Sequence, residues 1–242
     1  MPHPIIDQRR DPVLLFALSC TLALVWLMTG MVTADTVTEI FAESGPIEQT
    51  SVLFLLLSAL ALIIDILWRR DWGRWHLAVL VLAAGLRELD WDKAFTDSGI
   101  LQLRLYSGNA PLLHKIIGAG VVILLVWAGL RLLCRNLPDW LRALRGGDVS
   151  AWLLLATLGL YGVAKTLDGL GRKLAPLGIE ISDWANRTAG RGEEAMELLG
   201  AILILQVVGL SLIRRVADHH CPGGGRAENK PCSIRSRNVL AE

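Results

Sequence analysis

Six largely apolar segments, separated by charged ones, set the pattern of the sequence. They cover residues 12–33, 49–68, 75–94, 111–130, 149–169 and 194–213. A helix needs about 20 mostly apolar residues to cross the hydrocarbon core of a bilayer, and each segment is close to that length. The pattern therefore predicts an all-α polytopic membrane protein. Its six transmembrane helices form a bundle, and both termini lie on the same side.

The third segment differs from the others, because its largely apolar stretch, residues 76–86, is too short to cross a bilayer by itself. A helix here spans only if it also includes Arg87, Glu88 and Asp90. Ionisable groups at this depth are energetically costly, and they usually face a partner or a water-filled cavity. We therefore expect the other spans to supply polar partners for these three side chains.

Residues 1–217 are predicted to form this membrane domain, followed by a disordered cytoplasmic tail over residues 218–242. The tail is rich in Gly, Ser and Arg and has no apolar periodicity. Residues 100–106 form a shorter apolar patch before the fourth span, which we expect at the membrane interface. No cleavable signal peptide is expected, because the first apolar segment is long enough to remain as a span.

The positions of Lys and Arg predict the orientation. Hydrophobic residues make up 53% of the chain, and the 19% that are charged are grouped between the spans. The first connection, residues 34–48, contains no Lys or Arg. By the positive-inside rule, both termini are cytoplasmic. The basic residues placed on the cytoplasmic side include Arg9, Arg10, Arg69, Arg70, Arg74, Arg131, Arg135, Arg142, Arg145, Arg214 and Arg215.

Charged residues also recur at helical spacing at the opposite, outer ends of the spans. Arg87 and Asp90 are three residues apart on the third helix. Glu193 and Glu197 are four apart at the predicted start of the sixth, so each pair is expected to share a helix face. The candidate binding or catalytic residues, whose individual roles the sequence leaves open, are Glu48, Arg87, Glu88, Asp90, Lys93, Lys165, Asp168, Arg172, Glu194 and Glu197.

Two of the other helices contribute to this constellation. On the fifth, Lys165, Asp168 and Arg172 are spaced three and four apart, and they form one stripe if the helix continues past Gly169. Glu48 lies near the N-terminus of the second, where the helix dipole favours a carboxylate. The outer ends of the spans are therefore expected to hold a cluster of both signs of charge.

This cluster is compatible with three functions. A polar site near the outer (periplasmic) face would bind or process a polar or lipid-linked substrate, with basic groups holding its anionic part and a carboxylate acting as base or cation ligand. A non-catalytic membrane scaffold or assembly factor would use the charges as structural ion pairs. An ion-coupled carrier is disfavoured, because ionisable residues are scarce in the cytoplasmic halves of the spans. Asp65 is the main exception there, and we interpret it as an interface residue.

Missing motifs exclude several chemistries. The chain has no G-x-S-x-G elbow, no P-loop and no H-E-x-x-H. Basic residues mostly flank the spans, so no nucleic-acid partner is expected, and the partners are the lipid bilayer and a polar or lipid-linked small molecule. Enzymatic activity, cofactors and the identity of any metal stay open. A zinc site with several histidines is not expected, because the histidines do not gather on the outer side: they are His3, His76, His114, His219 and His220.

Four short motifs resemble those of a set of uncharacterised bacterial six-span inner-membrane proteins. The resemblance covers most of the chain before the tail, and it implies a membrane location and a shared outer-side site without implying an activity. Glu48-x-x-Ser51 is also similar to a motif of the membrane hydrolases related to alkaline ceramidase, but this chain lacks their zinc-binding histidines. The four motifs are Glu43-x-Gly45-Pro46-Ile47-Glu48, Arg87-Glu88-Leu89-Asp90-x-Asp92-Lys93, Lys165-Thr166-Leu167-Asp168-Gly169 and Glu193-Glu194-x-x-Glu197.

Overall fold

The computed structural model describes residues 10–31, 40–41, 45–91, 99–108 and 110–220. In this part of the chain all regular elements are helical and no β-strand occurs, as the sequence predicted. The elements are α1 (Arg10–Met31), α3 (Pro46–Arg69), η1 (Trp72–Arg74), α4 (Trp75–Glu88), α6 (Leu103–Ser107), α7 (Leu112–Arg135), α8 (Leu137–Arg145), α9 (Val149–Leu167), α10 (Leu170–Leu174), η2 (Ala175–Leu177) and α11 (Asp183–His220).

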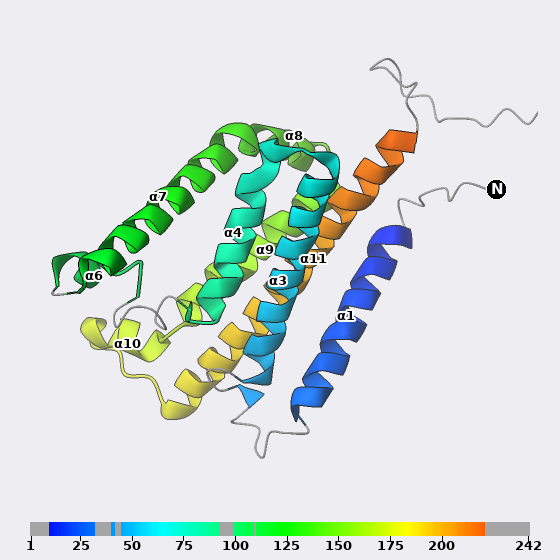
Figure 1. Cartoon of the computed structure of the whole chain (residues 1–242). Coiled ribbons are helices and arrows are strands. Elements are labelled where there is room, and N and C mark those ends of the chain that lie inside the picture. The colour runs from blue at the N-terminus through cyan, green and yellow to red at the C-terminus, as the bar shows by residue number, and fades with distance from the viewer. Residues whose placement is uncertain (1–9, 32–39, 42–44, 92–98, 109, 221–242) are drawn as a thin grey trace, which may run out of the picture.

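Helix α11 lies at the centre of the packing. It packs against α9, α3 and α1, and α3 in turn packs against α4 and α1. Figure 1 shows α1 at one edge of the bundle and α7 at the other, where α7 contacts α4. The short helix α8 connects α7 to α9 at one end of the bundle, whereas α10 and the start of α11 lie at the opposite end (Figure 1).

The core forms where α3 meets α11. Phe54 and Leu55 of α3 have no exposed surface, and they pack in one cluster with Ala201 and Ile202 of α11 and with Ala23 of α1. Alanines on the facing helices let the backbones approach closely, which favours van der Waals packing between membrane helices. This contact fixes α3, α11 and α1 relative to one another.

Buried hydroxyl groups in the helices satisfy their hydrogen bonds locally. Ser51 and Ser58 of α3 donate to the carbonyl oxygens four residues earlier, at 3.1 and 2.7 Å. Thr157 of α9 and Ser19 of α1 do the same, each at 2.9 Å. A polar group without a partner is costly in an apolar surrounding, and this back-bonding removes the cost without a partner on another helix.

Four helices are long and apolar enough to cross a membrane, and they coincide with four of the six predicted spans. They are α3, α7, α9 and the Asp183–Val216 part of α11. A candidate span here has at least 18 residues. The apolar stretch Pro12–Met28 of α1 and the 14-residue α4 are shorter than that. Large apolar side chains such as Ile116 and Ile123 of α7 are more than half exposed, as expected where a helix faces lipid. The six-span count itself stays a prediction.

Helix α4 ends earlier than predicted. Its last residue is Glu88, and Asp90 has a φ of 49°, in the left-handed region that an α-helix of L-residues avoids. The prediction that Arg87 and Asp90 share one face of a continuous helix is therefore wrong. Asp92, which belongs to the same sequence motif as Arg87 and Asp90, lies outside the described residues.

Helix α9 also stops before the predicted stripe is complete. It ends at Leu167, and Gly169 adopts a φ of 57° before α10 begins at Leu170. Glycine takes this left-handed conformation at little steric cost, so the chain can change direction here. The helix does not continue past Gly169, so the predicted single stripe of Lys165, Asp168 and Arg172 does not form.

Helix α11 begins well before the predicted sixth span. Its start is marked by Ser182, whose Oγ accepts a hydrogen bond from the backbone N–H of Ala185 at 3.2 Å, as an N-cap serine does. Glu193 and Glu194 therefore lie inside the helix. The prediction that they are at its N-terminus is wrong. At the other end α11 continues to His220, past the predicted start of the tail, and residues 221–242 lie outside the described part.

Candidate functional site

Lys165, in the last turn of α9, lies between two carboxylates of α11. Its Nζ is 2.8 Å from Glu197 Oε1 and 3.4 Å from Glu193 Oε1. Glu197 is only 6% exposed, whereas Lys165 is half-buried. Because both glutamates reach the same ammonium group, the prediction that they share one face of α11 is confirmed.

Three further glutamates extend this group. Glu88 of α4 interacts electrostatically with Glu197, with Lys165 and with Glu48 of α3. Glu194 interacts with Glu197, Glu48 and Glu88. Four helices therefore bring acidic or basic side chains to one place. We refer to Glu48, Glu88, Lys165, Glu193, Glu194 and Glu197 as the carboxylate cluster.

Tyr161 lies beside the carboxylate cluster, one helical turn before Lys165 on α9. Its phenol interacts electrostatically with Glu88 and Glu197. The ring packs so closely on α11 that a Cβ at Gly200 would be 2.8 Å from Tyr161 Cε2. Sequence reasoning did not single out Tyr161, although its four-residue spacing from Lys165 is a signal that the two share a face.

The remaining predicted residues lie at the margin or elsewhere. Asp168, directly after α9, interacts electrostatically with Glu193. Asp90 and Arg172 are exposed, in the turn after α4 and in α10. Lys93 lies outside the described residues. The predicted residues that the structure brings together are Glu48, Arg87, Glu88, Lys165, Glu194 and Glu197.

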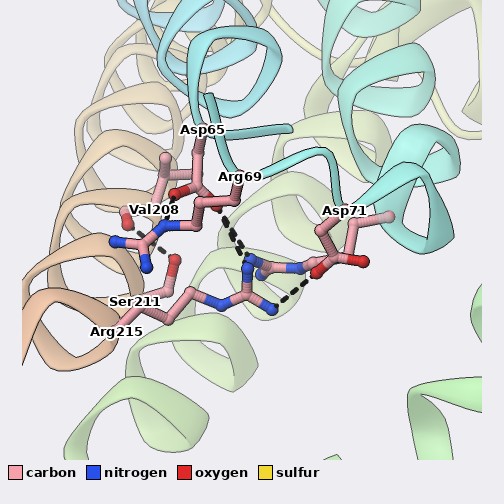
Figure 2. Close-up of polar contacts among 7 residues, drawn as sticks. Asp65, Arg69, Asp71, Val208, Ser211 and Arg215 are labelled. Atoms are coloured by element: carbon pink, nitrogen blue, oxygen red, sulfur yellow. Dashed lines mark hydrogen bonds and ion pairs between the residues drawn. The ribbon is translucent and has the colours of Figure 1, made fainter. Parts of the chain in front are cut away.

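A second charged group lies at the opposite end of α3 and α11, and Figure 2 shows its side chains facing one another. Asp65 is 8% exposed and accepts hydrogen bonds from Arg69 Nε at 2.6 Å and from Arg215 Nη1 at 3.1 Å. Arg74 Nη1 is 3.5 Å from Asp65 Oδ2, and Arg215 Nη2 also donates to Asp71 Oδ2 at 3.2 Å. We refer to Asp65, Arg69, Asp71, Arg74 and Arg215 as the arginine–aspartate network.

The network shows that the sequence interpretation of Asp65 as an interface residue is incomplete, because three arginines surround its buried carboxylate. Burial lowers the pKa of the Arg74 guanidinium, and the neighbouring Arg215 acts in the same direction, while Asp65 and Asp71 oppose both. The guanidinium keeps its charge at neutral pH because its ordinary pKa is so high. Asp65 therefore joins α3, η1 and α11 by charge-assisted hydrogen bonds and ion pairs.

Helix α7 is attached to the same end of the bundle. Arg131 Nη2 donates to the carbonyl oxygen of Gly73 in η1 at 3.2 Å. Arg135 lies so near that a Cβ at Gly73 would be 3.5 Å from its Nη2. The buried His76 of α4 bonds through Nε2 to Asn136 Oδ1 at 2.8 Å. The turn between α3 and α4 is thus held by basic side chains from α7 as well as from α11.

A third charged contact joins α11 to the residue before α9. Arg214 donates through Nη1 and Nη2 to the two carboxylate oxygens of Asp148, at 3.0 and 2.6 Å. These hydrogen bonds lower the pKa of the Asp148 carboxyl, and partial burial opposes them. Such a fork-to-fork pair fixes orientation as well as distance. It holds the start of α9 against the last part of α11.

No group of three or more His, Cys, Asp or Glu side chains in the described part of the chain is arranged to hold a metal ion. No family model, no curated protein and no solved structure matches the chain. The suggested family resemblance accordingly stays a prediction, and the function has to be argued from the two charged groups.

Proposed function

We propose that this is an integral protein of the bacterial inner membrane that binds the ammonium group of a polar or lipid-linked molecule in the carboxylate cluster. The observation that carries the proposal is the position of the Lys165 ammonium group between Glu193 and Glu197. That contact supports the proposal, because it places an ammonium group against two carboxylates of the cluster. An ammonium group donates three hydrogen bonds and suits several converging carboxylates.

The balance of charge supports a cationic ligand. The cluster contains five glutamates and one lysine, and Arg87 adds a second positive charge at its edge. Glu197 is buried and the other four glutamates are partly buried, so water screens their mutual repulsion less than it would on an open surface. A bound ammonium group reduces this repulsion, and the cluster is thus most stable with a ligand in place.

The same two groups support a proposed orientation in the membrane. Glu193 and Arg215 are both on α11, and at 1.5 Å per residue they are about 33 Å apart along its axis, close to the thickness of a hydrocarbon core. The arginine-rich end belongs on the cytoplasmic side by the positive-inside rule, which puts the carboxylate cluster at the periplasmic face and both termini in the cytoplasm. The exposed Cys134, at the end of α7, tests this. A membrane-impermeant maleimide should label it in inverted vesicles and not in intact cells with a permeable outer membrane.

Ligand-dependent melting of the purified protein tests the binding proposal. Spermidine and glycerophosphoethanolamine offer primary ammonium groups, and choline chloride at matched ionic strength offers a quaternary ammonium group, which has no N–H to donate. A ligand at 100 times its dissociation constant stabilises the folded state by about 2.7 kcal/mol. We expect a saturable rise in melting temperature with the two primary amines only.

Variants separate a specific site from a general effect of charge. Glu88→Gln and Glu194→Gln keep the side-chain volumes and should abolish the rise, whereas Asp139→Asn on the exposed face of α8 should leave it unchanged. If neither amine raises the melting temperature above the choline control, the proposal is wrong. The cluster is then a structural ion-pair network, as in the scaffold interpretation.

A further inference from the structure

An apolar groove opens between α3 and α4 beside the arginine–aspartate network. Its volume is about 180 Å³. It is lined by apolar and aromatic side chains, which include Ile63, Ile66 and Leu67 of α3, Trp72 of η1, and Trp75 and Val79 of α4. Leu67 and Trp72 are more than half exposed, so the groove faces the surroundings of the bundle and not its core.

The groove ends at the most basic part of the described chain. Arg69 and Arg70 follow directly on the groove-lining part of α3, and Arg74 lies between Trp72 and Trp75. Arg131 and Arg135 of α7 reach the same turn. The arginine–aspartate network contains two carboxylates, those of Asp65 and Asp71, and they are fewer than these basic groups and Arg215. The turn therefore carries an excess of positive charge.

Arg70 is placed to use that excess at the mouth of the groove. It follows α3 directly and comes three residues after Leu67, a groove-lining residue of the last turn of that helix. It caps α3 with a φ of 53° and is exposed, whereas Arg69 and Arg74 are turned toward Asp65. Its guanidinium is thus available to a ligand that also occupies the groove.

We infer that this groove binds one anionic phospholipid, with an acyl chain between α3 and α4 and the phosphate at the arginine-rich turn. An apolar channel that ends at several guanidinium groups matches the two parts of such a molecule. Guanidinium groups recognise phosphate through paired hydrogen bonds. Trp72 and Trp75 lie between the two, at the depth where tryptophan rings favour the membrane interface.

A topological role alone does not account for these features. The positive-inside rule explains why arginines gather on this side, but it does not require a groove that ends among them. A free phosphate ion would use the arginines and leave the groove without a function. The inference is independent of the carboxylate cluster, which lies at the other end of α3 and α11 (Figure 1).

Native mass spectrometry of the full-length protein in detergent tests the lipid site. The protein is titrated with phosphatidylglycerol or with phosphatidylethanolamine of the same chain length. Each basic residue near a membrane surface contributes a factor of about five to the binding of an anionic lipid. We expect the affinity for phosphatidylglycerol to exceed that for phosphatidylethanolamine, and Arg70→Gln to weaken it about fivefold.

Two further variants address the acyl chain and the specificity. Val79→Trp fills the groove and should abolish the lipid adduct, while Ile123→Trp, on the exposed face of α7, should keep it. Arg145→Gln, at the end of α8, removes an exposed arginine that does not line the groove, and this variant should bind as the wild type does. Gel filtration of each variant establishes that it is folded and monodisperse.

Three results would overturn the inference. Equal binding of the two lipids would exclude recognition of the anionic headgroup. Wild-type binding by both Arg70→Gln and Val79→Trp would exclude this groove as the site. Stabilisation by inorganic phosphate equal to that by phosphatidylglycerol would show that the arginines hold a free anion, without a lipid.

Discussion

Replacing Asp65 by asparagine removes the negative charge at the centre of three arginines. The asparagine would keep the volume of the side chain and one acceptor oxygen, so the change is mainly electrostatic. Arg69, Arg74 and Arg215 would then face one another across the end of α3 and α11 without their shared carboxylate. We expect this variant to be strongly destabilised.

The magnitude follows from the burial of the groups. Removing one partner of a fully buried ion pair costs about 3–5 kcal/mol, whereas exposed pairs contribute about 1 kcal/mol or less. The side chain of Asp65 is 7% exposed and those of Arg69, Arg74 and Arg215 are 18%, 19% and 32% exposed. The carboxylate is thus nearly as buried as in a fully buried ion pair, and its partners are intermediate between buried and exposed. We therefore expect the free energy of unfolding to fall by about 3 kcal/mol.

Thermal unfolding in lipid nanodiscs, followed by tryptophan fluorescence, measures this loss. For a domain of this size, 1 kcal/mol corresponds to about 2–4 °C in melting temperature, so Asp65→Asn should melt about 6–12 °C below the wild type. The matched control is Asp139→Asn on α8, whose pair with Arg142 is exposed on both sides. It should change the melting temperature by less than about 2 °C.

A double-mutant cycle shows whether the contacts act as one unit. Arg215→Gln removes the longest-range partner of Asp65 and also its own contact with Asp71. If the network is cooperative, the double variant should be more stable than the sum of the two single losses implies. A melting temperature of Asp65→Asn within about 2 °C of the wild type (about 1 kcal/mol or less) would refute the reasoning. Additive losses in the cycle would show that Asp65 and Arg215 are not coupled.

Two other predictions concern α11. Gly200→Ala places a Cβ 2.8 Å from the Tyr161 ring and should cost about 1–3 kcal/mol in thermal unfolding, whereas Gly190→Ala, with no neighbour within 4 Å, should be neutral or slightly stabilising; equal melting temperatures of the two variants would contradict the packing. Arg214 lowers the pKa of Asp148 in the folded state, so this pair stabilises the protein above the unfolded pKa of about 3.9 and loses its effect as the pH falls through the folded pKa. Arg214→Gln should therefore reduce the acid-induced drop in melting temperature, by the equivalent of about 1 kcal/mol or less, and an unchanged acid limb would argue against the pair.

Much of the fold was predictable, because membrane spans are read from apolar length alone. The second, fourth and fifth predicted spans match α3, α7 and α9 to within a few residues. The start of α11 was missed because residues 183–193 are polar and do not resemble a span, although Ser182 before Asp183 is an ordinary N-cap signal. The end of α4 was missed because an apolar and charged run gives no sign of where a left-handed residue will stop the helix.

The candidate site was predictable only in part, because its contacts join residues far apart in the chain. Spacing correctly paired Glu193 with Glu197, since both are on one helix. No local pattern shows that Lys165 of α9 lies between them. Asp65 was undervalued for the same reason, because its partner Arg215 is 150 residues away. Single-sequence reasoning finds charges at span ends but not which of them meet.

The distance in sequence between Asp65 and Arg215 has a consequence for biosynthesis. At about 5–20 residues per second, a ribosome needs roughly 8–30 s to add the 150 residues that separate them. During that interval α3 is already made, while α11, its main packing partner, is not. A nascent chain therefore holds an incomplete bundle until α11 has been made, and any machinery that shelters membrane intermediates would have to retain α3 for this time. Truncation before Asp183, where α11 begins, would leave that intermediate as the end product.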